Sequence, residues 1–556
     1  MEGPPLSSRG LGRILLASVV AATVLICSLT SVKQHFDGHL TKYRLLRELQ
    51  AAPALRLRFQ LKRKSMFVHG ASDFDVLAAR ADSGSSDGSI GYHGVATFQD
   101  DEGLAHEYLL ADGTAYYSRY NSVNTSEPIF TGCIPSSQVP PVHTVLNALH
   151  DAKRVELATD SKDIDLCPSP ATAWHFNFAG EPFVVCAQHS SFGASDGFQI
   201  FGSDLDIEVQ YDKTGELAIP TAPELSSSIS AQCGKVPDIE AARPSLGSLF
   251  TGFARDWSRQ LEQADGLLDD LFSSSDSTCS CSGAVRPCVF FAGMGSESDR
   301  GLMDSFAYFD GIADHAPCCS SIKFAVLDTT SYGWSDDSLQ QRACDLAIEA
   351  TGSTGPAIEN AIVVSHSMGG LTLAGAFATG KCSLADSSSW VAISTPVIGS
   401  MGSNYLQDVC AGAITDPVAG IMELIGRCPA SAAATALAYQ GSSYSFASLS
   451  EKFAAAQAAY VANVDAVMCS NSYEGLVSTY QAIYALAGAV IPHQSGENDG
   501  MVEFASCSAG LTATFSDSPT SPFYVTALNH IDTSFRNGDG LFDDAKKPLK
   551  WFECLL

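Results

Sequence analysis

Ser367 lies at the centre of the stretch NAIVVSHSMGG, which approximates the pattern G-x-S-x-G. In that pattern a serine sits on a tight turn between a strand and a helix, so its hydroxyl is exposed for attack on a carbonyl carbon. Gly369 and Gly370 supply the small residues that such a turn needs, whereas Ser365 replaces the first glycine. We predict that Ser367 is a nucleophile and that its neighbour His366 points away from it, as a pocket or packing residue.

A serine nucleophile needs a base to take its proton and an acid to orient that base. His530 in the segment LNHID and Asp499 in the segment NDGMV can fill these roles. We predict that His530 takes the proton and passes it to the leaving group, while Asp499 holds the imidazole in the required tautomer.

Three other residues compete for the base and acid roles. His493, in IPHQSGEND, follows a predicted strand but precedes the acid in the chain. Glu497 and Asp532 are alternatives to Asp499 as the acid. The residue types alone leave these alternatives open.

The negative charge that develops on an attacked carbonyl oxygen needs backbone N–H donors. The helix that begins near Met368 points one such N–H at this oxygen. A second donor is expected from the loop FAGMG, where either Gly293 or Met294 is placed to supply it. No cofactor and no metal site is predicted.

Four segments, SHSMGG, STP, NDGMV and LNHID, together resemble the α/β-hydrolase superfamily, especially its lipase-like members. The resemblance covers residues 286–556, about half of the chain. In that family the acid and the histidine follow the nucleophile in this order. Ala292 departs from the family pattern, because a histidine often stands there.

The resemblance implies a serine hydrolase that cleaves carboxylic esters, with lipid-like substrates, through an acyl-enzyme. An acyltransferase or a lipid-anchor deacylase would use the same three residues. A non-catalytic binding protein of the same fold, with a partner held by its N-terminal region, is the alternative outside enzymes.

Apolar strands alternate with helices throughout 286–556, which predicts a mostly parallel sheet covered by helices, the α/β-hydrolase fold. Strands are expected in PCVFF, SIKFAVLDT, NAIVVS, SSWVAIS, LAGAVIP and FYVTAL. The insertion at about 400–490 reads as amphipathic helices that cap the site, either as an acyl pocket or as a packing insertion. Cys410, Cys428 and Cys469 are expected to tie this cap.

Residues 33–220 carry short alternating runs that predict a β-rich domain, interrupted by one helix at 142–157. Residues 221–285 read as a linker with a helix. The run Lys62-Arg63-Lys64 is interpreted as a solvated face.

Composition sets the broad class of the protein. A chain of 556 residues with 46% hydrophobic and 17% charged residues has enough apolar material for two or three folded domains. Its formal net charge of −29 would repel phosphate backbones, so nucleic acid is excluded as a partner.

Residues 14–32, ILLASVVAATVLICSLTSV, carry no charge and are long enough to cross a bilayer. We predict a transmembrane signal anchor with residues 1–13 as a cytoplasmic tail, and a cleaved signal peptide is the alternative. The basic residues Lys42, Arg44 and Arg47 favour a cytoplasmic body.

The cysteines favour the opposite orientation. Sixteen follow the predicted anchor without metal-type spacing, so disulfides in the secretory lumen or outside the cell are expected. A glycosylation sequon at Asn124 agrees with that location. We therefore predict a single-pass membrane protein whose body is lumenal or extracellular; the sequence does not indicate an oligomeric state.

Overall fold

The computed structural model describes residues 40–81, 90–100, 103–121, 124–134, 136, 139–155, 167, 172–187, 196–212, 219–223, 233–239, 279–281, 283–415, 419–476, 478 and 480–555. The chain divides into two compact units. The first lies within Met1–Lys62 and Phe67–Asp276, and the second comprises Arg63–Met66 and Ser277–Leu556.

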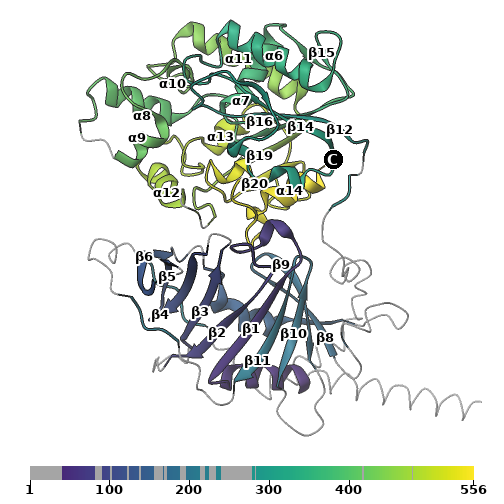
Figure 1. Ribbon diagram of the computed structural model, residues 1–556, viewed down its shortest axis with the longest axis vertical. Coiled ribbons are helices and arrows are strands. Elements are labelled where there is room, and N and C mark those ends of the chain that lie inside the picture. Colours follow the sequence, from purple (N-terminus) through teal and green to yellow (C-terminus); the bar gives the residue numbers. More distant parts are fainter. Residues whose placement is uncertain are drawn as a thin grey trace, which may run out of the picture. The chain divides into compact units, whose positions relative to one another are not determined.

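In the first unit, the described strands form one antiparallel sheet in the order β6-β5-β4-β3-β2-β1-β11-β10-β9-β8-β7 (Figure 1). Alternation in β1 buries Leu55 and Leu61, while Arg56 and Arg58 form ion pairs with acidic residues of β2. The strands are β1 (Ala54–Leu61), β2 (Asp73–Arg80), β3 (Tyr92–Gln99), β4 (Ala105–Ala111), β5 (Thr114–Asn121), β6 (Asn124–Ile134), β7 (Lys153–Val155), β8 (Thr172–Phe178), β9 (Glu181–Ala187), β10 (Gly197–Gly202) and β11 (Leu205–Asp212).

The helix predicted at 142–157 is shorter than expected. A 3-10 turn, η3 (Val142–Thr144), leads into α2 (Val145–Asp151), and Ala152 then takes an extended conformation. Residues 153–155 form β7, which pairs with β8. Pairing with the sheet edge therefore replaces the last part of the predicted helix.

The second unit contains a mixed seven-stranded sheet in the order β13-β14-β12-β16-β18-β19-β20. Its edge strand β13 runs antiparallel to β14, and the other neighbours are parallel. The strands are β12 (Arg286–Phe291), β13 (Gly301–Met303), β14 (Cys319–Val326), β16 (Ile362–His366), β18 (Ser389–Ile393), β19 (Ala466–Ser470) and β20 (Phe523–Thr526), and β15 (Ala357–Ile358) pairs separately with β17 (Ser383–Leu384).

Helices cover both faces of this sheet (Figure 1). Leu339, Leu371 and Phe453 of α6, α7 and α11 pack on one face. Phe309 of η5 and Trp551 of α14 pack on the other. The helices are α6 (Asp337–Thr351), α7 (Met368–Ala378), α8 (Met401–Cys410), α9 (Ala419–Ile425), α10 (Ala432–Ala436), α11 (Ala447–Asn463), α12 (Gln481–Val490), α13 (Phe504–Cys507) and α14 (Pro548–Cys554), and the 3-10 turns are η1 (Lys64–Met66), η5 (Ala307–Phe309), η6 (Ile312–His315), η7 (Asp532–Ser534) and η8 (Asp544–Lys546).

The predicted cap at 400–490 needs two corrections. It contains β19, a strand of the main sheet, because the apolar run AVMC pairs with β18 and β20 after α11 ends. The segment LAGAVIP, predicted as a strand, lies mostly in α12. What remains of the cap is α8, α9, α10 and α12, whose apolar residues form a cluster of their own.

The sixteen cysteines form eight disulfides, as the sequence predicts: Cys133–Cys233, Cys167–Cys186, Cys279–Cys554, Cys281–Cys318, Cys288–Cys319, Cys344–Cys382, Cys410–Cys428 and Cys469–Cys507. The bridge Cys410–Cys428 lies within the cap. Cys469 does not belong to the cap, since it joins β19 to α13.

The basic run at 62–64 is not a uniform solvated face. Arg63 is only 1% exposed and forms an ion pair with Glu553 of α14. Beside it, Ser65 donates to Asp539 at 2.7 Å. This short segment therefore supplies part of the second unit's interior.

Several predicted features lie outside the described residues. They are the tail and signal anchor at 1–32 and the helix expected near 245–272. Asn124 begins β6, but its side chain is also outside the described part. Of the helices that the structure describes, none has the length and apolar character needed to cross a bilayer.

Candidate active site

Ser367 occupies a strained turn between β16 and α7. Its backbone has φ 54° and ψ −130°, a conformation that residues with a side chain rarely adopt. Its N–H is fixed by the carbonyl of Ile393 at 2.9 Å. Such strain persists only where the surroundings impose it, and it is typical of functional positions.

The glycines after Ser367 make this turn possible. A Cβ on Gly369 would lie 2.7 Å from the carbonyl oxygens of Phe291 and Ala292. A Cβ on Gly370 would lie 2.1 Å from the hydroxyl of Thr395. Larger residues would push α7 away from the strands, so the small residues of the motif are required by close packing.

Ser365, the departure from the usual pattern, has a partner of its own. Its hydroxyl accepts a hydrogen bond of 2.9 Å from the indole Nε1 of Trp390 on β18. Both side chains are fully buried. A glycine at this position would leave a buried indole N–H without that acceptor.

The three predicted catalytic residues lie together in one hydrogen-bonded chain. The Nε2 of His530 lies 2.9 Å from the hydroxyl of Ser367. The Nδ1 of the same ring lies 2.7 Å from Oδ2 of Asp499. This is the geometry in which a histidine can accept a serine proton while a carboxylate orients it.

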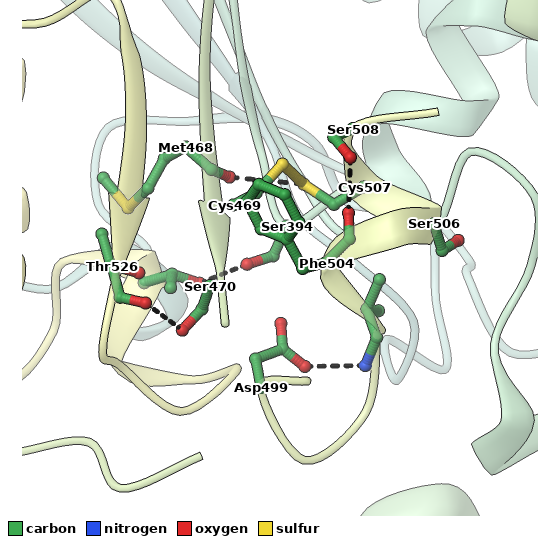
Figure 2. Close-up of a disulfide and its surroundings, with 12 residues drawn as sticks. Ser394, Met468, Cys469, Ser470, Asp499, Phe504, Ser506, Cys507, Ser508 and Thr526 are labelled. Carbon is green, nitrogen blue, oxygen red and sulfur yellow. Dashed lines mark hydrogen bonds between the residues drawn. A yellow bond between two sulfur atoms is a disulfide. The ribbon is translucent and has the colours of Figure 1, made fainter. Parts of the chain in front are cut away.

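The loop that carries Asp499 is held at both ends. Oδ1 of Asp499 accepts from the backbone N–H groups of Met501 and Val502, at 2.9 and 2.7 Å. The loop leads into α13, which the disulfide Cys469–Cys507 joins to β19 (Figure 2). The other carboxylate oxygen of Asp499, Oδ2, therefore points at Nδ1 of His530.

The three rival residues either make other contacts or are exposed to solvent. The side chain of His493 is buried and hydrogen-bonds to Glu503 at 2.9 Å. Asp532 accepts from the backbone N–H of Leu476, and burial raises its pKa to about 6. Glu497 has an exposed side chain and makes no described contact with His530. Asp499 is the carboxylate that contacts His530.

The loop after β12 brings its glycine against the nucleophile. A Cβ on Gly293 would lie 2.7 Å from Cβ of Ser367 and 2.7 Å from the hydroxyl of Tyr308. The loop of Gly293 and Met294, the two residues predicted for the second oxyanion donor, therefore lies against Ser367, and Met368 opens α7 directly after the nucleophile.

Tyr308 is a site residue that the sequence did not reveal. Its hydroxyl lies 2.7 Å from Nδ1 of His366, whose Nε2 lies 2.9 Å from the carbonyl of His530 and 3.0 Å from the hydroxyl of Thr533. Burial holds the pKa of His366 well below its ordinary value, with a further lowering from His530. Neutral His366 therefore accepts from Tyr308 and donates toward the His530 loop.

Burial also raises the pKa of Tyr308 to about 12, despite the opposing effects of the Gly293 backbone and of the nearby charge of Arg536. The phenol therefore keeps its proton and can donate a hydrogen bond to His366. Together these groups join the glycine loop, the turn of Ser367 and the loop of His530. The ring of His366 is buried between Tyr308 and the loop of His530.

One side of the site is apolar. Met294 packs against the cap cluster that includes Met401, Leu406 and Ile425. Met501, two residues after the acid, packs against the same cluster. Met294 and Met501 are partly exposed, so they are the apolar side chains that a substrate would meet on this side, with the buried cap residues behind them.

No protein-family model and no curated protein sequence matches the chain. Among solved structures, the mature lipase BlEst2 of Bacillus licheniformis has a TM-score of 0.32 and 17% identity, over 46% of this chain and 88% of that one. A metagenomic carboxyl esterase has a TM-score of 0.27 and 13% identity, over 46% and 67%. LprF from Mycobacterium bovis has a TM-score of 0.20 and 10% identity, over 33% and 96%. All three TM-scores are below 0.5.

Proposed function

We propose that this chain is a serine hydrolase of the α/β-hydrolase fold that cleaves carboxylic esters through an acyl-enzyme. The observation that carries the proposal is the continuous hydrogen-bonded chain from Asp499 through His530 to Ser367. The strained backbone of Ser367 at the end of a parallel strand supports it, because this turn presents the hydroxyl to a substrate.

In the reaction, the hydroxyl of Ser367 attacks the carbonyl carbon while Nε2 of His530 takes its proton. Asp499 stabilises the imidazolium that forms, and His530 then passes the proton to the departing alcohol. Water attacks the acyl-enzyme by the same route in reverse, which releases the acid and restores Ser367. The N–H groups of Met368 and Met294 stabilise the oxyanion in both steps.

We also propose that the substrate is lipid-like. The support is the pair of partly exposed methionines, Met294 and Met501, which pack on the buried apolar core of the cap. An acyl chain lying there would be removed from water while its ester carbonyl reaches Ser367. Transfer of the acyl group to an alcohol in place of water would need no additional residue in the triad.

A fluorophosphonate probe tests the proposal, because it modifies an activated serine. The full chain should be labelled, Ser367→Ala should not be labelled, and Asp499→Asn should be labelled much more slowly. Ser321→Ala is the control, since this exposed serine lies on β14 away from the triad. Equal labelling of wild type and Ser367→Ala would refute the assignment and favour a non-catalytic binding protein.

We further propose that the body of the protein lies in the secretory lumen or outside the cell, held by residues 14–32. The eight disulfides support an oxidising compartment. In intact microsomes, residues after 33 should resist added protease and become sensitive once detergent is present. Digestion without detergent would refute this topology and favour the orientation that the basic residues after the anchor predict.

A further inference from the structure

Arg536 places a guanidinium group beside the triad. Its Nε and Nη2 donate to the carbonyl of Tyr308 at 3.3 and 3.1 Å, and its Nη1 lies 3.5 Å from the hydroxyl of Tyr480. Its Cζ lies 5.2 Å from the ring centre of Tyr308 and 5.5 Å from that of Tyr480. Within the part of the chain that the structure describes, no carboxylate lies at ion-pairing distance from it, whereas Arg342 pairs with Asp299.

Each of the two tyrosines that Arg536 contacts lies close to residues of the triad or to their neighbours. A Cβ added at Gly293 would lie 2.7 Å from the hydroxyl of Tyr308 and 2.7 Å from Cβ of Ser367. On the other side, Tyr480 precedes Tyr484 by about one helical turn, and the Tyr484 ring lies 6.5 Å from that of His530. Arg536 therefore contacts Tyr308, whose hydroxyl lies near Ser367, and Tyr480, which precedes the helix that carries Tyr484.

The surroundings of Ser367 thus differ on its two sides. Met294 and the cap cluster are apolar, whereas the side of Tyr308 and Tyr480 carries Arg536. An ester has two parts, an acyl chain and an alcohol. The apolar side suits the acyl chain, which leaves the alcohol part to face the guanidinium.

Arg536 has hydrogen-bonding capacity left for a ligand. A guanidinium carries five N–H donors, and the contacts to Tyr308 and Tyr480 use three of its groups once each. Its planar fork matches the oxygens of a phosphate. Since the whole chain has a formal charge of −29, an anionic substrate needs such a local positive group to offset repulsion.

We propose that Arg536 binds a phosphate on the alcohol part of the ester substrate. The proposal depends on the function proposed above and adds a substrate class to it. Arg536 acts as a specificity-determining residue, because it stabilises the phosphate and takes no part in bond breaking.

Two esters that differ only in the phosphate test this, 1-octanoylglycerol and 1-octanoylglycerol 3-phosphate. With the full-length wild type, kcat/KM should be about 10- to 100-fold higher for the phosphate, the usual range for a hydrogen bond to a charged group. Arg536→Gln should bring the ratio of the two values close to one while leaving the neutral ester nearly unchanged. Arg536→Lys should give an intermediate ratio, because it keeps the charge without the planar fork.

Arg300→Gln is the matched control. Arg300 lies 5.4 Å from the ring of Phe306, which stacks on Tyr308. The Arg300→Gln substitution therefore removes the same charge at a position one ring farther from Ser367. Its ratio should remain that of the wild type. A wild type that prefers the neutral ester, or an Arg536→Gln variant that loses both activities equally, would overturn the proposal and leave the hydrolase assignment intact. A wild type that hydrolyses neither ester would count against both.

Discussion

Replacing Gly293 by alanine tests the packing at the nucleophile most directly. The added Cβ would lie 2.7 Å from Cβ of Ser367, 3.1 Å from its hydroxyl oxygen and 2.7 Å from the hydroxyl of Tyr308. The backbone of Gly293 is not in the left-handed region, so alanine adds a methyl group without backbone strain. The effect should therefore come from the contact alone.

The size of the effect follows from the distance that must be regained. Ordinary contact between carbon atoms begins near 3.4 Å, so Ser367 or the loop must move by roughly 0.7 Å. A misplacement of about 1 Å costs around 100-fold in rate. We expect kcat/KM to fall by roughly 10- to 100-fold, equivalent to about 1.4 to 2.7 kcal/mol of transition-state stabilisation.

The assay is hydrolysis of p-nitrophenyl butyrate, normalised to the protein that remains folded in a thermal scan. Gly355→Ala is the control, because a Cβ there meets nothing within 4 Å. Full activity in Gly293→Ala would refute the close approach of this loop to Ser367. A loss of activity that merely follows a loss of folded protein would refute the local explanation.

Three further predictions concern residues around the triad. Ser365→Gly should lower the free energy of unfolding in urea by about 1–3 kcal/mol, because buried Trp390 Nε1 loses its acceptor; unchanged or higher stability would contradict this. Tyr308→Phe should cost a similar amount, because His366 Nδ1 loses its donor, and an unchanged urea midpoint would show that this bond contributes nothing. Burial raises the pKa of Asp532 from 3.8 to about 6, so its contribution to stability is present below pH 4 and is lost as pH rises through 6. Asp532→Asn should remove that loss, on the order of 3 kcal/mol between pH 4 and 7, and identical pH slopes for the two proteins would refute the shift.

The contacts among Ser367, His530 and Asp499 could be expected because each residue lies in a short motif and the motifs occur in a fixed order. Tyr308 could not, since it lies 58 residues before its partner His366 in a segment without a motif. The bond between them arises from packing of η5 against the end of β16. Only tertiary structure brings these residues together.

The errors in secondary structure have a common physical origin. The segment that forms α12 is almost entirely apolar, so its pattern does not separate a buried strand from a helix. The run that includes α11 and β19 reads as one helix, yet Asp465 accepts from the N–H of Trp390 and the strand begins at the next residue, Ala466. When both faces of an element are buried, local periodicity locates the apolar segment but does not show whether it is a helix or a strand.

The basic neighbours of Arg63 in the chain predict a solvated side chain, which it is not. Its partner Glu553 is 490 positions later, and no local pattern reports a contact of that length. The carboxylate of Glu553 also hydrogen-bonds to His315, and the side chains of Arg63, His315 and Glu553 are all buried in the second unit.

That contact has a consequence for synthesis on the ribosome. Residues 63–66 emerge early, but Glu553 emerges only when almost the whole chain has been translated. The second unit can therefore finish folding only after elongation is nearly complete, and its first segment must wait through some 490 residues of synthesis. A shortened gene that begins at residue 277 would encode a unit that leaves Glu553 without its arginine and Asp539 without Ser65.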